Sequence, residues 1–168
     1  MDKKLVVSPS PHIHSGASTS NLMRDVIIAL VPAFIVSVLF YGLPAVITTA
    51  IAVSSAVVFE YLISKFILKA KSSICDYSAA LTGFLLAFNL PSDISWWIVI
   101  IGSLVAIGIG KMSYGGIGKN LFNPALVGRV VLLISFPAQM TTFTPVAGSA
   151  EIDATSGATF LTFIKSAV

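Results

Sequence analysis

Long apolar runs separated by short polar stretches make up most of this chain. The runs at 22–41 and 45–68 have the length of spanning helices, since a helix needs about 20 apolar residues to cross a bilayer. The run at 96–110 begins with two tryptophans, an aromatic pair typical of the membrane interface. With shorter runs at 76–90 and 121–136, the pattern predicts an all-α integral membrane protein of about five transmembrane segments.

Three of these runs differ from a simple spanning helix, two by an interruption and one by its length. The first contains Pro32, where we expect a break. The run at 76–90 is too short for a straight crossing, so we expect it to be tilted or shielded by protein. The run at 121–136 contains Asn123-Pro124 and is expected to be broken or re-entrant. Non-helical backbone survives at membrane depth only where protein or a cavity satisfies its hydrogen bonds.

Composition supports a membrane location. Hydrophobic residues make up 56% of the 168, charged residues 10%, and the mean hydropathy is +0.95. Soluble domains carry about 25% charge, so this chain has too little polar surface for water. The net charge of +3 does not indicate nucleic acid, because the cations are scattered singly and form no basic stripe. A single cysteine and the isolated His12 and His14 predict neither an internal disulfide nor a metal site.

The distribution of charge predicts the orientation. Positive charges prefer the cytoplasmic side of a membrane. With the N-terminal arm inside, that side holds eight of the ten cations, and the other side holds Asp93, Glu151 and Asp153. The eight cations are Lys3, Lys4, Arg24, Lys65, Lys69, Lys71, Lys111 and Lys119. The expected parts are a cytoplasmic arm (1–21), a membrane bundle (22–136), an external loop (137–159) and the start of a further apolar segment (160–168).

Four ionisable residues, Asp25, Glu60, Asp76 and Arg129, lie in or at the edge of apolar runs. A charge inside a bilayer costs a few kcal/mol, so such residues normally face a cavity or a partner. They are therefore candidates for an ion path. The structural alternatives are an Arg24–Asp25 pair at a helix start and Asp76 as the cap of the third segment. Arg129 can pair with one of the carboxylates or bind a lipid headgroup.

A glycine-rich loop joins the fourth and fifth runs. It contains Gly115, Gly116, Gly118 and Asn120 and continues to Asn123. Three glycines and a lysine can present backbone N–H groups to an anion. The stretch lacks the GxxxxGK[ST] spacing and follows no strand, which argues against a P-loop. The alternative is a tight turn where backbones pack closely.

The external loop ends in a short segment of small and hydroxyl-bearing residues, Ser156, Gly157, Ala158 and Thr159. Such a segment can lie flat against a ligand. The structural alternative is an N-cap, with Ser156 or Thr159 capping the helical turn that follows.

This SGAT segment resembles the motif in which a threonine hydroxyl is esterified to the phosphate of FMN by a flavin transferase. Further stretches agree, in order along the chain, with one family. The chain resembles the RnfD subunits of Rnf electron-transport complexes and is similar to their relatives, the NqrB subunits of sodium-translocating NADH:quinone reductases. The stretches are Ser8-Pro9 to His12, Asp76 to Gly83, Leu90-Pro91 with Trp96-Trp97, Tyr114 to Ala125, and Ser135 to Pro137 with Met140-Thr141.

The resemblance implies a membrane flavoprotein of the bacterial cytoplasmic (inner) membrane, within a pump that couples ferredoxin-to-NAD electron transfer to Na⁺ or H⁺ export. Thr159 would anchor FMN covalently in an external, periplasmic loop, with Ser156, Gly157 and Ala158 read by the transferase. The glycine and asparagine loop would shape the membrane core near a flavin, and Arg129 could meet a flavin phosphate. A second flavin, such as riboflavin, is left open. The implied partners are Rnf subunits of the A, B, C, E and G types, the flavin transferase and the lipid bilayer.

Members of this family are about twice as long and contain two related sets of spans. We therefore expect this chain to form the N-terminal half of an inverted-repeat bundle, as a fragment, a partial chain or a split gene product. Two other functions stay open. One is a channel or carrier half of urea-transporter type without a redox role, in which SGAT is only a helix cap. The other is a purely structural role in a membrane assembly.

Overall fold

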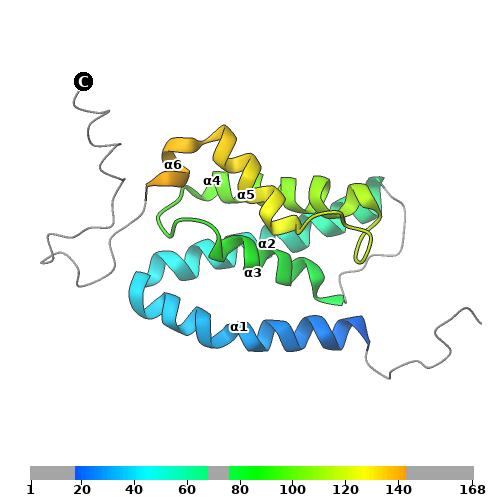
Figure 1. Ribbon diagram of the computed structural model, residues 1–168, viewed down its shortest axis with the longest axis horizontal. Coiled ribbons are helices and arrows are strands. Elements are labelled where there is room, and N and C mark those ends of the chain that lie inside the picture. Colours follow the sequence, from blue (N-terminus) through cyan, green and yellow to red (C-terminus); the bar gives the residue numbers. More distant parts are fainter. Residues whose placement is uncertain (1–17, 68–75, 143–168) are drawn as a thin grey trace, which may run out of the picture.

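The computed structural model describes residues 18–67 and 76–142 of the chain. These residues form helices and contain no strand, which confirms the all-α prediction. Three helical stretches among them are long and apolar enough to cross a membrane: Thr19–Tyr41, Leu43–Ile67 and Trp96–Tyr114. Two further apolar helices are shorter. Figure 1 shows α1, α2, α3 and α4 running roughly along one common direction, with α5 crossing them obliquely.

The first helix, α1 (Thr19–Tyr41), begins where the Ser18 hydroxyl accepts a hydrogen bond from Asn21 N, 3.2 Å away. It runs through Pro32 without a break, so the expected interruption is wrong. A proline removes only one backbone hydrogen bond, and membrane helices tolerate this loss where local adjustments re-satisfy the freed carbonyl. Gly42 alone reverses the chain, with φ 67°, a backbone conformation that favours glycine.

The two other long stretches each end in a π-helical segment. Helix α2 (Leu43–Leu62) continues into η1 (Ile63–Ile67). Helix α4 (Trp96–Val105) continues into η3 (Ala106–Lys111) and then the 3-10 turn η4 (Met112–Tyr114). The two π-helical segments pack together, since Ile63 joins a buried cluster that contains Ile107 and Met112.

The remaining helices are short: α3 (Ser78–Phe88), α5 (Pro124–Ser135) and α6 (Pro137–Thr141). Helices α3 and α5 have 11 and 12 residues. At 1.5 Å per residue each measures roughly 17 Å, about half of a bilayer core near 30 Å thick. The prediction that the third segment is too short for a straight crossing is therefore confirmed in length.

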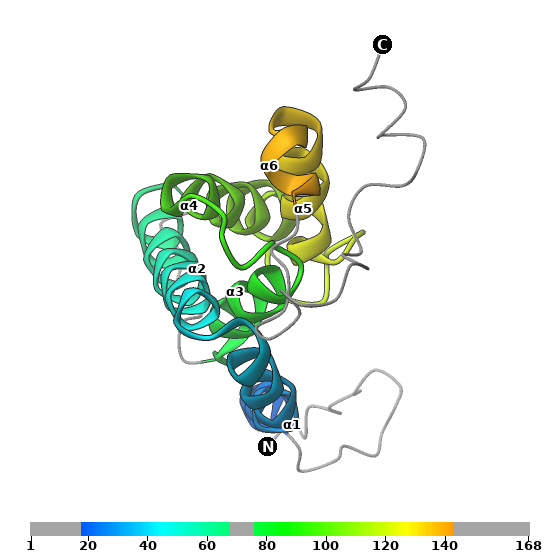
Figure 2. The same cartoon turned by 90° about the vertical axis from the view of Figure 1, so that its left-hand side faces the viewer.

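Small residues allow the short helices to pack closely into the bundle. A Cβ on Gly83 of α3 would lie 2.6 Å from the Ala52 backbone oxygen of α2. A Cβ on Gly128 of α5 would lie 2.9 Å from the Gly102 oxygen of α4. Figure 2 shows α2, α3, α4 and α5 grouped together and α1 at the periphery. Helix α1 contains no buried residue.

Candidate functional site

A buried ion pair lies between α2 and the end of η3. The Lys111 ammonium donates to Glu60 Oε2 and to Ser78 Oγ, each across 2.5 Å. The relative exposure is 0% for Glu60 and 1% for Lys111. Side chains from α2, α3 and η3 therefore meet at one point, although Glu60 and Lys111 are 51 positions apart in the sequence.

The helices depart from α geometry where they supply this cluster. Lys111 is the last residue of η3, and Ser64, one turn beyond Glu60, belongs to η1. π-Helical turns are rare and are often found at functional sites. Ser64 is 1% exposed, and its Oγ has no hydrogen-bond partner among the described residues. Since residues four apart share a helix face, this hydroxyl lies on the side of α2 that carries Glu60.

The surroundings of the pair are apolar. The buried residues nearby are Ala56, Ala79, Ile107 and Met112. Ionisable groups inside a membrane bundle commonly mark ion paths and proton relays. The Glu60 carboxylate supplies a negative charge, and the Lys111 ammonium pairs with it. The expectation that Glu60 faces a partner inside the bundle is therefore confirmed.

Lys111 was missed by the sequence reasoning, which placed it among the cations of a cytoplasmic loop. The structure corrects this placement, because the side chain is buried against Glu60. The available signal was its position directly after the apolar run Ile107-Gly108-Ile109-Gly110, without an intervening polar residue. No pattern along the chain joins this lysine to a carboxylate on a helix so far away.

The two aspartates take different places. Asp25 lies 3.5 Å from Arg24, and both side chains are largely exposed, which confirms the expected pair at the start of α1. Helix α3 begins after Tyr77, with φ 57°, and no side chain caps it. The predicted Asp76 cap is therefore wrong, because the left-handed Tyr77 occupies the N-cap position. Neither aspartate takes part in the Glu60–Lys111 pair.

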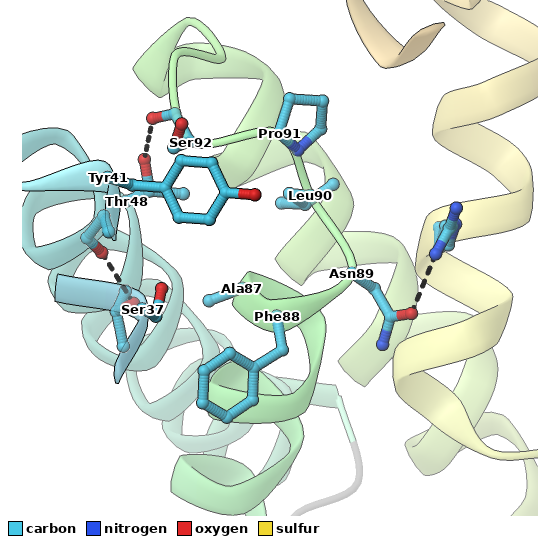
Figure 3. A pocket seen from close by; sticks show the side chains of 12 residues that line it. Ser37, Tyr41, Thr48, Ala87, Phe88, Asn89, Leu90, Pro91 and Ser92 are labelled. Atoms are coloured by element: carbon cyan, nitrogen blue, oxygen red, sulfur yellow. Dashed lines mark hydrogen bonds between the residues drawn. The ribbon is translucent and has the colours of Figure 1, made fainter. Parts of the chain in front are cut away.

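Among residues 18–67 and 76–142, Arg129 of α5 pairs with no carboxylate. Its Nη1 donates to Asn89 Oδ1 across 2.9 Å. Within the described residues the salt bridges are Arg24–Asp25 and Lys111–Glu60, so the predicted acidic partner of Arg129 is wrong. Arg129 and Asn89 instead line a cavity of about 200 Å³ beside the ends of α1 and α3 (Figure 3).

The glycine-rich loop forms a tight turn. Gly115, Gly116 and Gly118 have φ values of 97°, 93° and 82°, which side-chain-bearing residues rarely adopt. With its amide oriented to satisfy both neighbours, Asn120 donates to the carbonyls of Gly116 and Lys111 at 2.9 and 3.2 Å.

The end of this loop starts the fifth helix. The Asn123 Oδ1 caps α5 by accepting from Ala125 N across 3.0 Å. The loop lies at the opposite end of the bundle from α6 (Figure 1).

The SGAT residues Ser156, Gly157, Ala158 and Thr159 lie outside the described residues. The described chain ends at Thr142, directly after α6. A common surface hollow is lined by Pro91, Asp93 and Thr142. The residues just after α6 therefore lie beside the loop that follows α3.

Comparison with known proteins adds to this geometry. Residues 6–168 match the model of the NQR2, RnfD, RnfE family. The chain is 45% identical over 139 residues to the D-type subunit of the ion-translocating oxidoreductase complex of Haemophilus influenzae, covering 81% of this chain and 38% of the relative. It is 49% identical over 137 residues to the D-type subunit of the Na(+)-translocating ferredoxin:NAD(+) oxidoreductase complex of Acetobacterium woodii, covering 82% and 43%. The chain therefore spans about two fifths of the length of these curated relatives.

Proposed function

Because this chain belongs to the NQR2, RnfD, RnfE family, we propose that it acts in the membrane part of an Rnf-type ion-translocating electron-transport complex. The observation that carries the proposal is the family match over 6–168, which includes both the helical bundle and the SGAT segment. Its partners would be the other subunits of that complex. In this arrangement the N-terminal arm is cytoplasmic, and the loop after α6 faces the outside of a bacterial inner membrane.

The proposed cofactor is FMN, joined through its phosphate to the hydroxyl of Thr159 by a flavin transferase. FMN supplies the redox chemistry, whereas the protein supplies the anchor, the orientation and the electrostatic surroundings. Thr159 follows the last described residue, Thr142, by 17 positions. This segment can span at most about 61 Å, since an extended chain covers up to about 3.6 Å per residue. The tether therefore allows the flavin to reach the whole face of the bundle that carries α6.

In-gel fluorescence of the denatured protein tests the covalent anchor. The protein is produced in cells that contain the transferase, and the gel is viewed under ultraviolet light. We expect a fluorescent band from the wild type and none from Thr159→Ala. Thr155→Ala is the matched control, because it removes a threonine hydroxyl from the same segment. We expect this variant to keep the fluorescence of the wild type. A band of equal intensity from Thr159→Ala would refute the anchor.

We further propose that Glu60 is a charged step of the ion path. Glu60 is fully buried and paired with Lys111. Four positions further along, the buried Ser64 hydroxyl has no hydrogen-bond partner among the described residues. A cation or proton that arrives at the carboxylate would have to displace the Lys111 ammonium or share the carboxylate with it.

Ion transport by the complex in liposomes tests this role. Glu60→Gln removes the charge and preserves the shape of the side chain, so we expect ion transport to fall at least tenfold while covalent flavin is retained. Asp25→Asn is the matched control, because Asp25 is exposed and outside the cluster, and we expect its transport to match the wild type. Unchanged transport in Glu60→Gln would contradict the proposal.

A channel or carrier half without a redox role remains the second function. The short helices α3 and α5 favour it, since incomplete crossings are typical of transporter binding regions. Solute flux into liposomes from flavin-free protein would support this function, and its absence would favour the flavoprotein.

A further inference from the structure

The cavity of about 200 Å³ shown in Figure 3 combines polar and apolar walls. Hydroxyl groups come from Ser37 and Tyr41 on α1 and from Ser92 in the loop after α3. Asn89 and Arg129 add an amide and a guanidinium, while the apolar part of the lining includes side chains such as Phe88 and Leu90. In Figure 3 the ring of Tyr41 points its hydroxyl toward Leu90 and Pro91. The cavity is therefore suited to a ligand with one polar end.

The charges of the lining do not balance. Among the described residues that line the cavity, Arg129 is the one charged residue, and none carries a carboxylate. A guanidinium does not lose its proton in proteins, so this positive charge persists. Its partner Asn89 is neutral. Asn89 is also the C-cap of α3, so Arg129 lies near the C-terminal end of that helix. The C-terminal end of a helix carries roughly half a negative charge, so α3 compensates only part of the charge on Arg129.

We propose that this cavity binds the phosphate group of an amphipathic phosphate ester, with Arg129 as its counter-charge. A partly buried charge that its surroundings compensate only in part favours a bound anion. The planar guanidinium fork matches the geometry of phosphate oxygens. Only one of its five N–H donors is engaged by Asn89 in the described hydrogen bonds. The Tyr41 hydroxyl can donate a further hydrogen bond to the anion.

The volume limits what the cavity can hold. Sites for whole cofactors or drug-sized ligands measure about 300–1,000 Å³, and this cavity is smaller. It fits a phosphate with its ester linkage, while the apolar part of the ligand lies outside it. Two molecules could supply such a group: a phospholipid, or the FMN proposed on Thr159. The second source rests on the proposed function, whereas the first does not.

Binding of a short-chain lipid to the purified protein tests the site. The probe is dihexanoyl phosphatidylglycerol, titrated into the detergent-solubilised protein and followed by native mass spectrometry. Dihexanoylglycerol, which lacks the phosphate, is the control ligand. We expect Arg129→Gln to weaken phosphatidylglycerol binding at least tenfold. Arg24→Gln is the matched control, because Arg24 is exposed at the start of α1, and its affinity is expected to equal that of the wild type.

A second pair of variants keeps the test valid if Arg129→Gln does not fold. Arg129→Lys retains the charge without the planar fork, and Tyr41→Phe removes one hydroxyl without changing any charge. We expect each variant to weaken phosphatidylglycerol binding about threefold, because the loss of one neutral hydrogen bond weakens binding by about that factor. Affinities equal to the wild type in both variants would overturn the proposal, as would equal binding of the two lipids.

Thr159→Ala distinguishes the two sources. If the flavin phosphate normally occupies the cavity, removal of the flavin makes phosphatidylglycerol bind more tightly than in the wild type. If a phospholipid is the natural occupant, both proteins bind the probe equally and both depend on Arg129. If the wild type carries no flavin, the proposed cofactor is wrong. The effect of Arg129→Gln on phosphatidylglycerol binding then still tests whether the cavity binds phosphate. Binding that is independent of Arg129 in both backgrounds would refute the site.

Discussion

At the scale of single residues, the sequence identified the carboxylate of the buried cluster but not its partner. Glu60 stood out because it is a charge within an apolar run. Lys111 ends such a run and looked like an ordinary loop cation, yet its ammonium lies 2.5 Å from Glu60. Contacts between helices decide such pairings, and one sequence does not contain them. The same reason explains why Asn89, the partner of Arg129, could not be predicted.

The pairing of Glu60 and Lys111 predicts a specific pattern of stability. Glu60→Gln and Lys111→Met each leave one charge uncompensated in the core, and we expect each to lower the free energy of unfolding by about 3–5 kcal/mol. The double variant removes both charges and should lose less than either single variant, since a buried pair can often be replaced by neutral side chains. Thermal unfolding of the purified protein in detergent measures this. Additive losses in the double variant would show that the two residues do not act as a pair.

At the scale of elements, the pattern of apolar runs predicted about five segments, with a third segment too short for a straight crossing. The expected break at Pro32 did not occur, because a single missing hydrogen bond does not stop a long apolar helix. The π-helical segments η1 and η3 were not predicted, since their residues have the same apolar character as the helices before them. The turn at Gly115 to Gly118 was predicted and is present, with positive φ at its three glycines, while anion binding by this loop stays a prediction.

The close contact of α3 with α2 predicts a difference between two glycines. Gly83→Ala would place a Cβ 2.6 Å from the backbone oxygen of Ala52, so we expect a loss of about 1–3 kcal/mol in stability. Gly108→Ala is the matched control, because its Cβ would lie 3.6 Å from the flexible end of Ile63, an ordinary contact. Alanine also favours a helix over glycine by about 1 kcal/mol. The stabilities of the two variants are compared by following the loss of helical circular dichroism with denaturant. Equal stability of Gly83→Ala and Gly108→Ala would contradict this packing.

At the scale of the whole molecule, the features suited to chemistry fall into three regions. The Glu60–Lys111 cluster lies where η1 and η3 meet, and the Arg129 cavity lies where α1 and α3 end. The SGAT segment with Thr159 follows α6 in the sequence. The residues at the end of α6 lie beside the loop after α3, so Thr159 is tethered to that end of the bundle. Composition and charge sorting predicted a membrane protein and its orientation, while the family came from ordered motifs. Neither could place the cavity, which is formed by side chains from four separate segments.

The proposal that this chain carries FMN in a membrane electron-transport complex is tested most directly by the intact mass of the purified protein. The protein is isolated from cells that contain the flavin transferase, and Thr159→Ala and Thr155→Ala are isolated in parallel. The account predicts that the wild type and Thr155→Ala are each heavier than their sequences by one FMN less one water. Thr159→Ala should have the mass of its sequence alone. A wild-type protein of unmodified mass from such cells would contradict the account.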